Sequence, residues 1–339
     1  MRIVKASNGK AAGADGWSPT ELCLLPDGFF EAVALIWEVV LQGATLPPSW
    51  KAIRCAGIPK DTGGLRPLSI SSIFWRCGST ALLSKMSVWI DEWAPHELAG
   101  GLRGRCADSI HESLEESLER IWDCGEPLAG SKLDVEKFFD SCDLEQALAV
   151  VDRVGMPREI SELLRQFYRG QERYFEVAGV CCPRPVYPKR SFLQGCPWSM
   201  MLIAALVALW QKSNHAMGAN DVHAGIFVDN RALWATGKGA AGRVAAAHQA
   251  GRELDRKFGW MDHPDKRESF ASAKGTKTPS GTSSRWPASC KMNSSSWGLC
   301  IGSRGEGTRR SWRTRRRRRS SLVDCTGSSA CAGSDSGGT

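Results

Sequence analysis

The sequence of 339 residues predicts an α+β fold with helices packed on a small antiparallel sheet. Three observations predict it. Up to about residue 275, apolar residues recur at the helical period in long segments and at the strand period in short ones. Two of the short segments, residues 222–228 and 231–235, flank Asp229-Asn230 like the arms of a hairpin. After residue 275 the periodicity stops.

The other predicted elements begin and end at ordinary sequence signals. Residues 29–41 have helical apolar spacing and are closed by Gln42-Gly43, and Pro197 suits the first residue of a helix that reaches about residue 212. Further helices are expected at residues 73–93, 109–122, 144–154, 158–169 and 239–258. Short strands are expected at residues 53–58, which Pro59 ends, and at residues 132–135.

Composition separates a folded part from a tail. Residues 276–339 are rich in Ser, Gly, Thr, Arg and Pro without a period, so we expect a low-complexity, disordered segment there. Nine arginines and one glutamate between residues 304 and 319 account for the whole net charge of +8. The basicity therefore belongs to the tail and does not indicate a basic folded face.

The sequence offers no sign of secretion or of a membrane span. No apolar run approaches the ~20 residues that cross a bilayer, and the N-terminus shows no secretory signal. The thirteen cysteines are scattered without a Cys-x-x-Cys pair. We expect free thiols in an intracellular protein, nuclear or cytoplasmic, with little support for a structural zinc site.

Three short segments combine acids, aromatic rings and glycine. Residues 133–140 read LDVEKFFD, with Asp134 directly after a short strand. Residues 192–197 read FLQGCP and open a helix, and residues 226–230 read IFVDN at the tip of the hairpin. Taken alone, an Asp-Asn pair is what a turn prefers, and a glycine before a helix is an ordinary start signal.

Together and in this order, the three segments resemble the palm of the reverse transcriptases, which are RNA-directed DNA polymerases. That family has the pattern D-x-x-x-x-[FY]-D, then a Q-G-x-P loop, then an aromatic-x-D-D hairpin. Upstream, residues 50–69 contain W-K, I-P-K and R-P-L-S, which is similar to the fingers segment of non-long-terminal-repeat retrotransposons. Residues 13–17, GADGW, look like the G-x-D-G stretch near their start. The resemblance covers roughly residues 10–275.

The resemblance implies a right-hand polymerase with fingers and palm. Residues 1–40 would form an N-terminal helical extension of the fingers, and residues 41–275 the fingers and palm. The thumb is expected to be missing or degenerate, although residues 297–302, WGLCIG, look like the short late palm motif. The implied activity is two-metal nucleotidyl transfer from dNTPs to a primer 3′ hydroxyl. The implied partners are an RNA template, a DNA primer and dNTPs, with no membrane.

The resemblance also assigns site residues. Asp134 and Asp229 would hold Mg²⁺ (or Mn²⁺), with carboxylates roughly 3–6 Å apart. The other implied site residues are the Val135 carbonyl as a further metal ligand, Asn230 as the second residue of the catalytic pair, Lys60 and Arg66 at the triphosphate, Phe139 against the ribose 2′ hydroxyl, Gln194 and Gly195 at the nucleotide and template, and Lys266 as the late palm lysine. Singly, the cations could be surface charges and Phe139 or Phe138 a core aromatic.

The pattern departs from the family at three places. Asn230 replaces the second acid of the hairpin, residues 198–200 read WSM where the family often has [LQ]-S-P, and no thumb is readable. Two alternatives therefore stay open. A viral RNA-dependent RNA polymerase shares the palm and can carry Asp-Asn, although Phe139 and residues 50–69 favour a reverse transcriptase. A truncated or frameshifted relic, inactive or at most RNA-binding, is favoured by Asn230 and the tail. The oligomeric state is not indicated.

Overall fold

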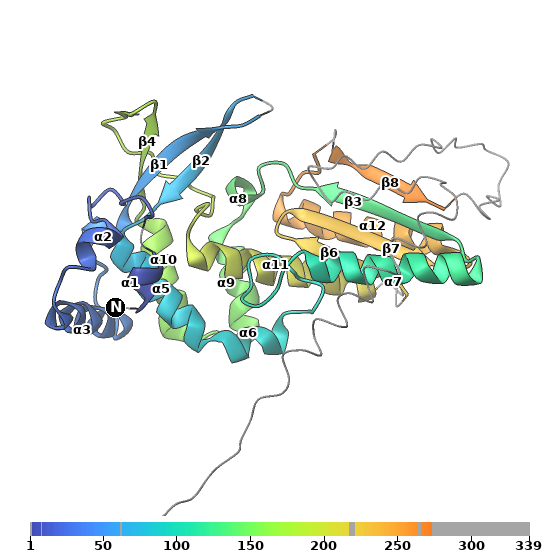
Figure 1. The fold of residues 1–339 in the computed structure, drawn as a ribbon, viewed down its shortest axis with the longest axis horizontal. Coiled ribbons are helices and arrows are strands. Elements are labelled where there is room, and N and C mark those ends of the chain that lie inside the picture. Colours follow the sequence, from blue (N-terminus) through green and yellow to red (C-terminus); the bar gives the residue numbers. More distant parts are fainter. Residues whose placement is uncertain (1, 8, 62, 217–220, 264–265, 273–339) are drawn as a thin grey trace, which may run out of the picture. The chain divides into compact units, whose positions relative to one another are not determined.

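The computed structural model describes residues 2–7, 9–61, 63–216, 221–263 and 266–272, which fall within one compact unit, Met1–Lys277. Two four-stranded sheets and the helices around them make up its described part (Figure 1). The predicted tail, with its arginine run and residues 297–302, lies outside the described residues. No helix in the described ranges combines the length and the apolarity that crossing a membrane requires.

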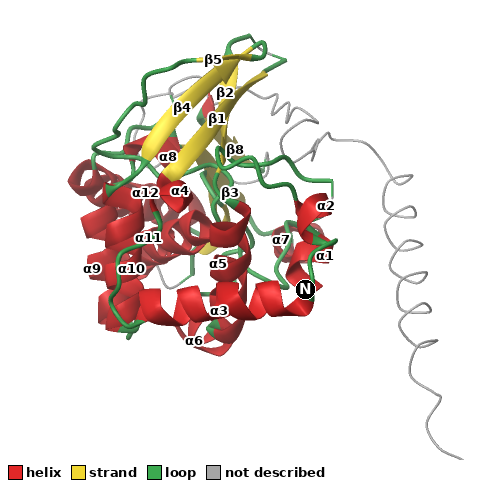
Figure 2. Cartoon of the chain, turned by 90° about the vertical axis from the view of Figure 1, so that its left-hand side faces the viewer, coloured by secondary structure: helices red, strands yellow, loops and turns green. Residues whose placement is uncertain are grey.

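The first sheet has the strand order β2-β1-β4-β5. Its strands are β1 (Ala52–Pro59), β2 (Leu65–Ile70), β4 (Glu172–Val177) and β5 (Val180–Cys181). β1 is antiparallel to β2 and parallel to β4. Figure 2 shows these strands standing above the helices. Pro67 is tolerated within β2 because β2 is an edge strand, where a missing N–H breaks no ladder bond.

The second sheet has the strand order β6-β7-β3-β8, and every neighbouring pair is antiparallel. Its strands are β3 (Leu128–Asp134), β6 (His223–Phe227), β7 (Asn230–Thr236) and β8 (Glu268–Ala271). β3 is buried along its whole length, as expected of a central strand. This is the antiparallel sheet that the hairpin pattern predicts.

Helices cover both faces of the second sheet. α12 (Ala240–Phe258) packs on β3 and β7, where the buried Arg231 pairs with Asp255. α7 (Asp108–Cys124) lies on the other face, where its Ser117 accepts a hydrogen bond from the Trp234 indole. Because side chains alternate along a strand, Arg231 and Trp234 point to opposite faces.

The remaining helices pack around two apolar clusters of the described residues: a large core that joins the two sheets, and a smaller one of Val4, Leu22 and Ile73. They are α1 (Arg2–Ala6), α2 (Pro19–Leu22), α3 (Asp27–Leu41), α4 (Pro48–Lys51), α5 (Ile73–Lys85), α6 (Ser87–Trp93), α8 (Phe138–Ser141), α9 (Leu144–Arg153), α10 (Arg158–Arg169) and α11 (Pro197–Ala216). α11 contacts α5, α9 and α12. Trp75 stacks on Phe167 at 3.7 Å between ring centroids, and the core continues to Trp260 beside the second sheet.

Four predictions need correction. The structure has two sheets instead of one, because β2, β4, β5 and β8 carry weak local signals, and the first sheet contains a parallel pair. The helix predicted at residues 73–93 is interrupted at Met86, whose N–H is shared between two carbonyls. The strand predicted at residues 132–135 begins four residues earlier. The hairpin turn is Val228-Asp229, one residue before the predicted pair, so Asn230 is the first residue of β7.

Candidate active site

The ends of β3 and of the β6–β7 hairpin meet at one corner of the second sheet. Asp134, the last residue of β3, is the direct cross-strand partner of Asn230. Partners in register share a face of the sheet, with Cβ atoms about 4.5–5.5 Å apart. Asp229 lies in the turn that immediately precedes Asn230. The two acids and the amide are therefore brought to one place by the sheet itself.

The hairpin turn is held in a strained conformation. Val228 has φ +59°, in the left-handed region that a β-branched residue rarely adopts. Such a residue costs about 1–3 kcal/mol and persists only where the surroundings impose it. Gly100 packs against the turn so closely that a Cβ there would lie 2.6 Å from the Val228 nitrogen. The neighbouring Ala99 N–H also donates to the carbonyl of Ile226, at 2.8 Å.

Charges at this corner act on one another. Burial raises the pKa of Asp229 above its ordinary value, and the negative charge of Asp134 raises it further. Lys266 opposes this shift, and its Nζ donates to Asp134 Oδ2 at 3.1 Å. Asn230 Nδ2 donates to Asp229 Oδ1 at 3.2 Å. The structure thus groups four predicted site residues, while the predicted 3–6 Å between the carboxylates stays a prediction.

The chain after α12 fixes the exit of β3. His263 N–H donates to the Asp134 carbonyl, and Glu136 N–H donates to the Met261 carbonyl, both at 2.8 Å. Val135 is buried and forms a backbone bridge with Asp262. These contacts explain how Lys266, 132 residues beyond Asp134, reaches its carboxylate.

The two aromatics after Asp134 separate in the structure. Phe138 points into the core and meets the Trp260 ring edge-to-face at 4.7 Å. Phe139 is half-buried, and its carbonyl accepts a 2.7 Å hydrogen bond from the N–H of Phe192. Phe138 is therefore the core aromatic, and part of Phe139 remains accessible.

The Gln194-Gly195 loop lies against the first sheet. The Gln194 carbonyl accepts a hydrogen bond from Ser69 N–H of β2 at 2.9 Å. Gly195 has φ +117°, and a Cβ there would lie 2.7 Å from the Ser69 carbonyl oxygen. Both its conformation and its surroundings therefore require glycine. The loop joins Phe192, which is bonded to Phe139, with the start of α11.

Lys60 and Arg66 belong to the β1–β2 hairpin of the first sheet. Both side chains are exposed, and Arg66 is the cross-strand partner of Ile58. Lys60 N–H closes the turn on the Gly64 carbonyl at 3.1 Å. No contact described for either cation places it at Asp134 or Asp229. Ser69, three residues after Arg66 in β2, does contact a predicted site residue, because its N–H donates to the Gln194 carbonyl.

Sequence reasoning missed a buried polar group behind this loop. Arg173 of β4 is 7% exposed and donates hydrogen bonds to Gln171 and Ser191. Ser191 in turn donates to Asp140, at the end of the LDVEKFFD segment. An arginine in the alternating stretch ERYFEV at residues 172–177 reads as a surface residue, so only the fold reveals its burial.

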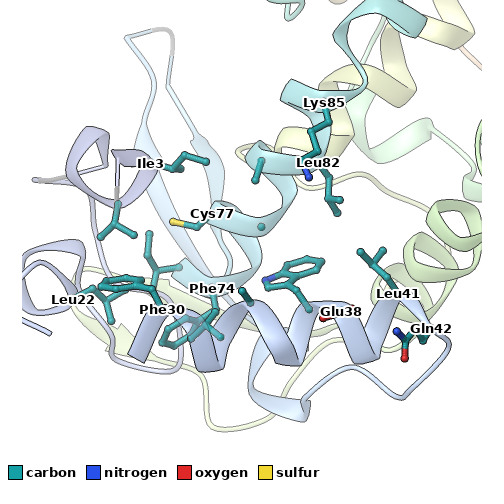
Figure 3. Close-up of a pocket in the computed structure, with 17 residues that line it drawn as sticks. Ile3, Leu22, Phe30, Glu38, Leu41, Gln42, Phe74, Cys77, Leu82 and Lys85 are labelled. Carbon is teal, nitrogen blue, oxygen red and sulfur yellow. The ribbon is translucent and has the colours of Figure 1, made fainter. Parts of the chain in front are cut away.

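An apolar cavity among the described residues lies elsewhere. It has a volume of about 670 Å³ and is lined by α1, α2, α3 and α5, with Phe30, Phe74 and Cys77 among its walls (Figure 3). None of the predicted site residues lines it. It is therefore no part of the candidate active site.

The acids suit a hard divalent cation. Among the described residues, no group of three or more His, Cys, Asp or Glu side chains could enclose a metal ion. Mg²⁺, however, is usually held by one or two carboxylates together with substrate phosphates and water. The mutual repulsion of Asp134 and Asp229 is what a bound cation would relieve. The donor set fits Mg²⁺ on condition that the substrate supplies the remaining oxygens.

Comparisons with known proteins agree with this architecture. No protein-family model and no curated protein sequence matches the chain. Among solved structures, it is similar to apo telomerase from Candida tropicalis truncated from its C-terminal domain, with TM-score 0.53 and 12% identity, over 81% of this chain and 61% of that one. It is also similar to telomerase from Candida tropicalis in complex with the TWJ fragment of telomeric RNA, with TM-score 0.51 and 11% identity, over 73% and 45% of the two chains.

At these identities the likeness shows the fold. The chain has a fold like that of telomerase, a polymerase related to the reverse transcriptases, and it spans about half to three fifths of the length of those two chains. The expectation of a reverse-transcriptase-like architecture is confirmed at that level. The non-long-terminal-repeat type, and the division into fingers and palm, stay predictions.

Proposed function

We propose that this chain is the RNA-directed DNA polymerase domain of a retroelement of non-long-terminal-repeat type. In this proposal the second sheet is the palm and the first sheet belongs to the fingers. One observation carries it: Asp134, Asp229 and Lys266 meet at the strand ends of an antiparallel sheet, in a fold like that of telomerase. The partners are an RNA template, a DNA primer and dNTPs.

In this proposal, each site residue has a separate role in nucleotidyl transfer. Asp134 and Asp229, with the Val135 carbonyl, would hold Mg²⁺ or Mn²⁺, which activates the primer 3′ hydroxyl and stabilises the departing pyrophosphate. Lys266 holds the Asp134 carboxylate in place by its 3.1 Å hydrogen bond. Lys60 and Arg66 would meet the triphosphate if the β1–β2 hairpin closes over the site.

The nucleotide would lie between the two sheets. Phe139, which is half-buried and lies five residues after Asp134, would stand under the sugar and exclude a 2′ hydroxyl. The Gln194-Gly195 loop would line the nucleotide and template from the side of β2, to which Ser69 ties it. The absence of a side chain at Gly195 lets that backbone approach closely.

Asn230 limits the activity. The amide supplies an oxygen without negative charge, so the metals are held by less charge than an Asp-Asp pair provides. This residue is the observation that favours the two other candidate functions, a viral RNA-dependent RNA polymerase and an inactive relic that at most binds RNA. Activity with Mg²⁺ is therefore expected to be weak.

A primer-extension assay on a primed RNA template tests the proposal. Asn230→Asp should raise extension of the primer with dNTPs and Mg²⁺, and Asp229→Asn should abolish whatever the native chain shows. Asp221→Asn, an exposed acid at the opposite end of β6, is the matched control and should leave extension unchanged.

Each alternative gives a distinct result in this assay. Extension with ribonucleotides in preference to deoxynucleotides would indicate an RNA polymerase. No extension by the native chain or by Asn230→Asp, with Mg²⁺ or Mn²⁺, would reject the polymerase and leave the relic. Robust native activity with Mg²⁺ would instead reject the relic.

A further inference from the structure

A buried arginine occupies the junction between the first sheet and the candidate site. Arg173 of β4 is 7% exposed, and its backbone pairs with Val186 through two hydrogen bonds. Its guanidinium donates to Gln171 Oε1 at 3.2 and 3.0 Å, to Ser191 Oγ at 2.9 Å and to the Ser191 carbonyl at 3.1 Å. Four donated bonds converge on two residues, so the guanidinium plane is fixed.

The Arg173 guanidinium is connected to the Asp140 carboxylate through a single side chain, that of Ser191. Ser191 Oγ accepts from Arg173 and donates to Asp140 Oδ1 at 3.0 Å, so the serine hydroxyl relays between the two charges. Burial lowers the pKa of Arg173, and the nearby Cys55, Tyr168 and Asp140, in that order, oppose that shift. A buried cation is tolerated only with such compensation. Arg173 therefore holds the end of α8 as well as the segment at Ser191.

Ser191 is in a conformation that needs this support. Its φ is +140°, which residues with a Cβ rarely adopt, and position 191 is a serine where a glycine would be unstrained. The next residue, Phe192, donates its N–H to the carbonyl of Phe139 at 2.7 Å. Two residues later, Gln194 accepts from Ser69 of β2. A change at Ser191 would consequently move the segment that holds Phe139.

We propose that Arg173 is a positioning residue that sets where the Phe139 ring stands, and thereby how strongly the chain prefers deoxynucleotides to ribonucleotides. This inference rests on the proposed function. The cation need not touch the nucleotide, because its effect passes through Ser191 to the Phe192–Phe139 hydrogen bond and to Asp140, the residue directly after Phe139. Displacing a positioning group by about 1 Å can change a rate on the order of 100-fold.

The experiment uses the full chain and two readouts. The first is the ratio of kcat/KM for a dNTP to that for its rNTP, on a primed RNA template. The second is hydrogen–deuterium exchange of the Phe192 amide, which needs no activity. The variants are Arg173→Met, Arg173→Lys and Ser191→Ala. Arg54→Met is the matched control, since Arg54 pairs with Glu176 on the opposite face of the same sheet.

Arg173→Met should lower the dNTP preference about tenfold or more and speed exchange of the Phe192 amide about tenfold. Lysine keeps the charge without the forked donors, so Arg173→Lys should recover only part of the preference. Ser191→Ala should reproduce the loss with the cation retained, which covers the case of a poorly folding Arg173→Met. In a Phe139→Ala background, Arg173→Met should change the ratio no further, because both act through one ring.

Two results would overturn the inference. One is unchanged exchange of the Phe192 amide in Arg173→Lys and Ser191→Ala, which would remove the positioning role whether or not the chain polymerises. The other is faster exchange with an unchanged dNTP preference in an active enzyme. Failure of both the native chain and Asn230→Asp to extend any primer, with Mg²⁺ or Mn²⁺, would instead reject the proposed function, and the nucleotide preference with it.

Discussion

Gly195 offers a sharp test of how the loop before α11 is held. In Gly195→Ala, two independent penalties are expected. The first is conformational, since φ +117° is unfavourable for any residue with a Cβ, at about 1–2 kcal/mol. The second is steric, since the new Cβ would lie 2.7 Å from the Ser69 carbonyl oxygen, which is rigid backbone. Relief of the clash would separate the loop from β2.

The size of the steric penalty follows from the hydrogen bond that is lost when the loop moves away from β2. Ser69 N–H donates to the Gln194 carbonyl at 2.9 Å, and an ordinary hydrogen bond contributes about 0.5–1.5 kcal/mol. Gly195→Ala should therefore lower the free energy of unfolding by about 1.5–3.5 kcal/mol. Gly43→Ala is the matched control, because Gly43 has φ +102° with nothing within 4 Å of its Cβ position. It should lose only the conformational part, about 1–2 kcal/mol.

Urea denaturation of both variants, followed by tryptophan fluorescence, measures the difference. Alanine reduces the entropy of the unfolded chain equally at the two positions, so that contribution cancels in the comparison. If Gly195→Ala loses no more stability than Gly43→Ala, the close approach of the loop to β2 is wrong. Primer extension adds a second check, since only Gly195→Ala should impair the proposed activity.

Two further predictions concern the buried side chains Arg231, which faces α12, and His248, which belongs to α12. Arg231→Met should lower the free energy of unfolding by about 3–5 kcal/mol, because it leaves the Asp255 carboxylate buried without its 2.7 Å partner. In urea denaturation, adding Asp255→Leu should recover part of that loss. An equally large loss in Arg54→Met, which breaks an ion pair that is partly exposed, would contradict this reasoning. His248 has its pKa lowered to about 4, by burial and then by Arg267, so the unfolded chain takes up the proton first. The contribution of His248 to the free energy of unfolding should be fully present above pH 6.5 and fall by about 3 kcal/mol as the pH drops towards 4. His248→Gln should flatten that pH dependence.

The helices were the most predictable part of the fold, because their signals are local. The helix predicted at residues 158–169 coincides with α10, and Pro197 begins α11 as its fixed φ favours. β2 was missed because Pro67 argues against a strand, and only the sheet order reveals that β2 is an edge. β4 pairs in parallel with a strand about 120 residues earlier, which no local pattern encodes.

The residues of the candidate site also differ in how far the sequence predicts them. Asp134, Asp229 and Asn230 could be named from short motifs, because each follows or opens an apolar strand. Lys266 was assigned from its place in the order of motifs, and its 3.1 Å contact with Asp134 depends on the bonds of residues 261–263 to the end of β3. Arg173 and Ser191 carry no motif at all. Their roles arise from burial and from a positive φ, which only the folded chain expresses.

These contacts also explain how a site at the corner of one sheet can depend on the other sheet. Two routes lead from the first sheet to the loop between residues 191 and 195: Arg173 of β4 binds Ser191, and Ser69 of β2 binds Gln194. From that loop, the Phe192 N–H reaches the Phe139 carbonyl, five residues beyond Asp134. Because hydrogen bonds and a close backbone contact fix both ends of the loop, a shift of the first sheet must either move Phe139 or break one of them. A displacement of the β1–β2 hairpin, which carries Lys60 and Arg66, would therefore reach Phe139 through the same loop.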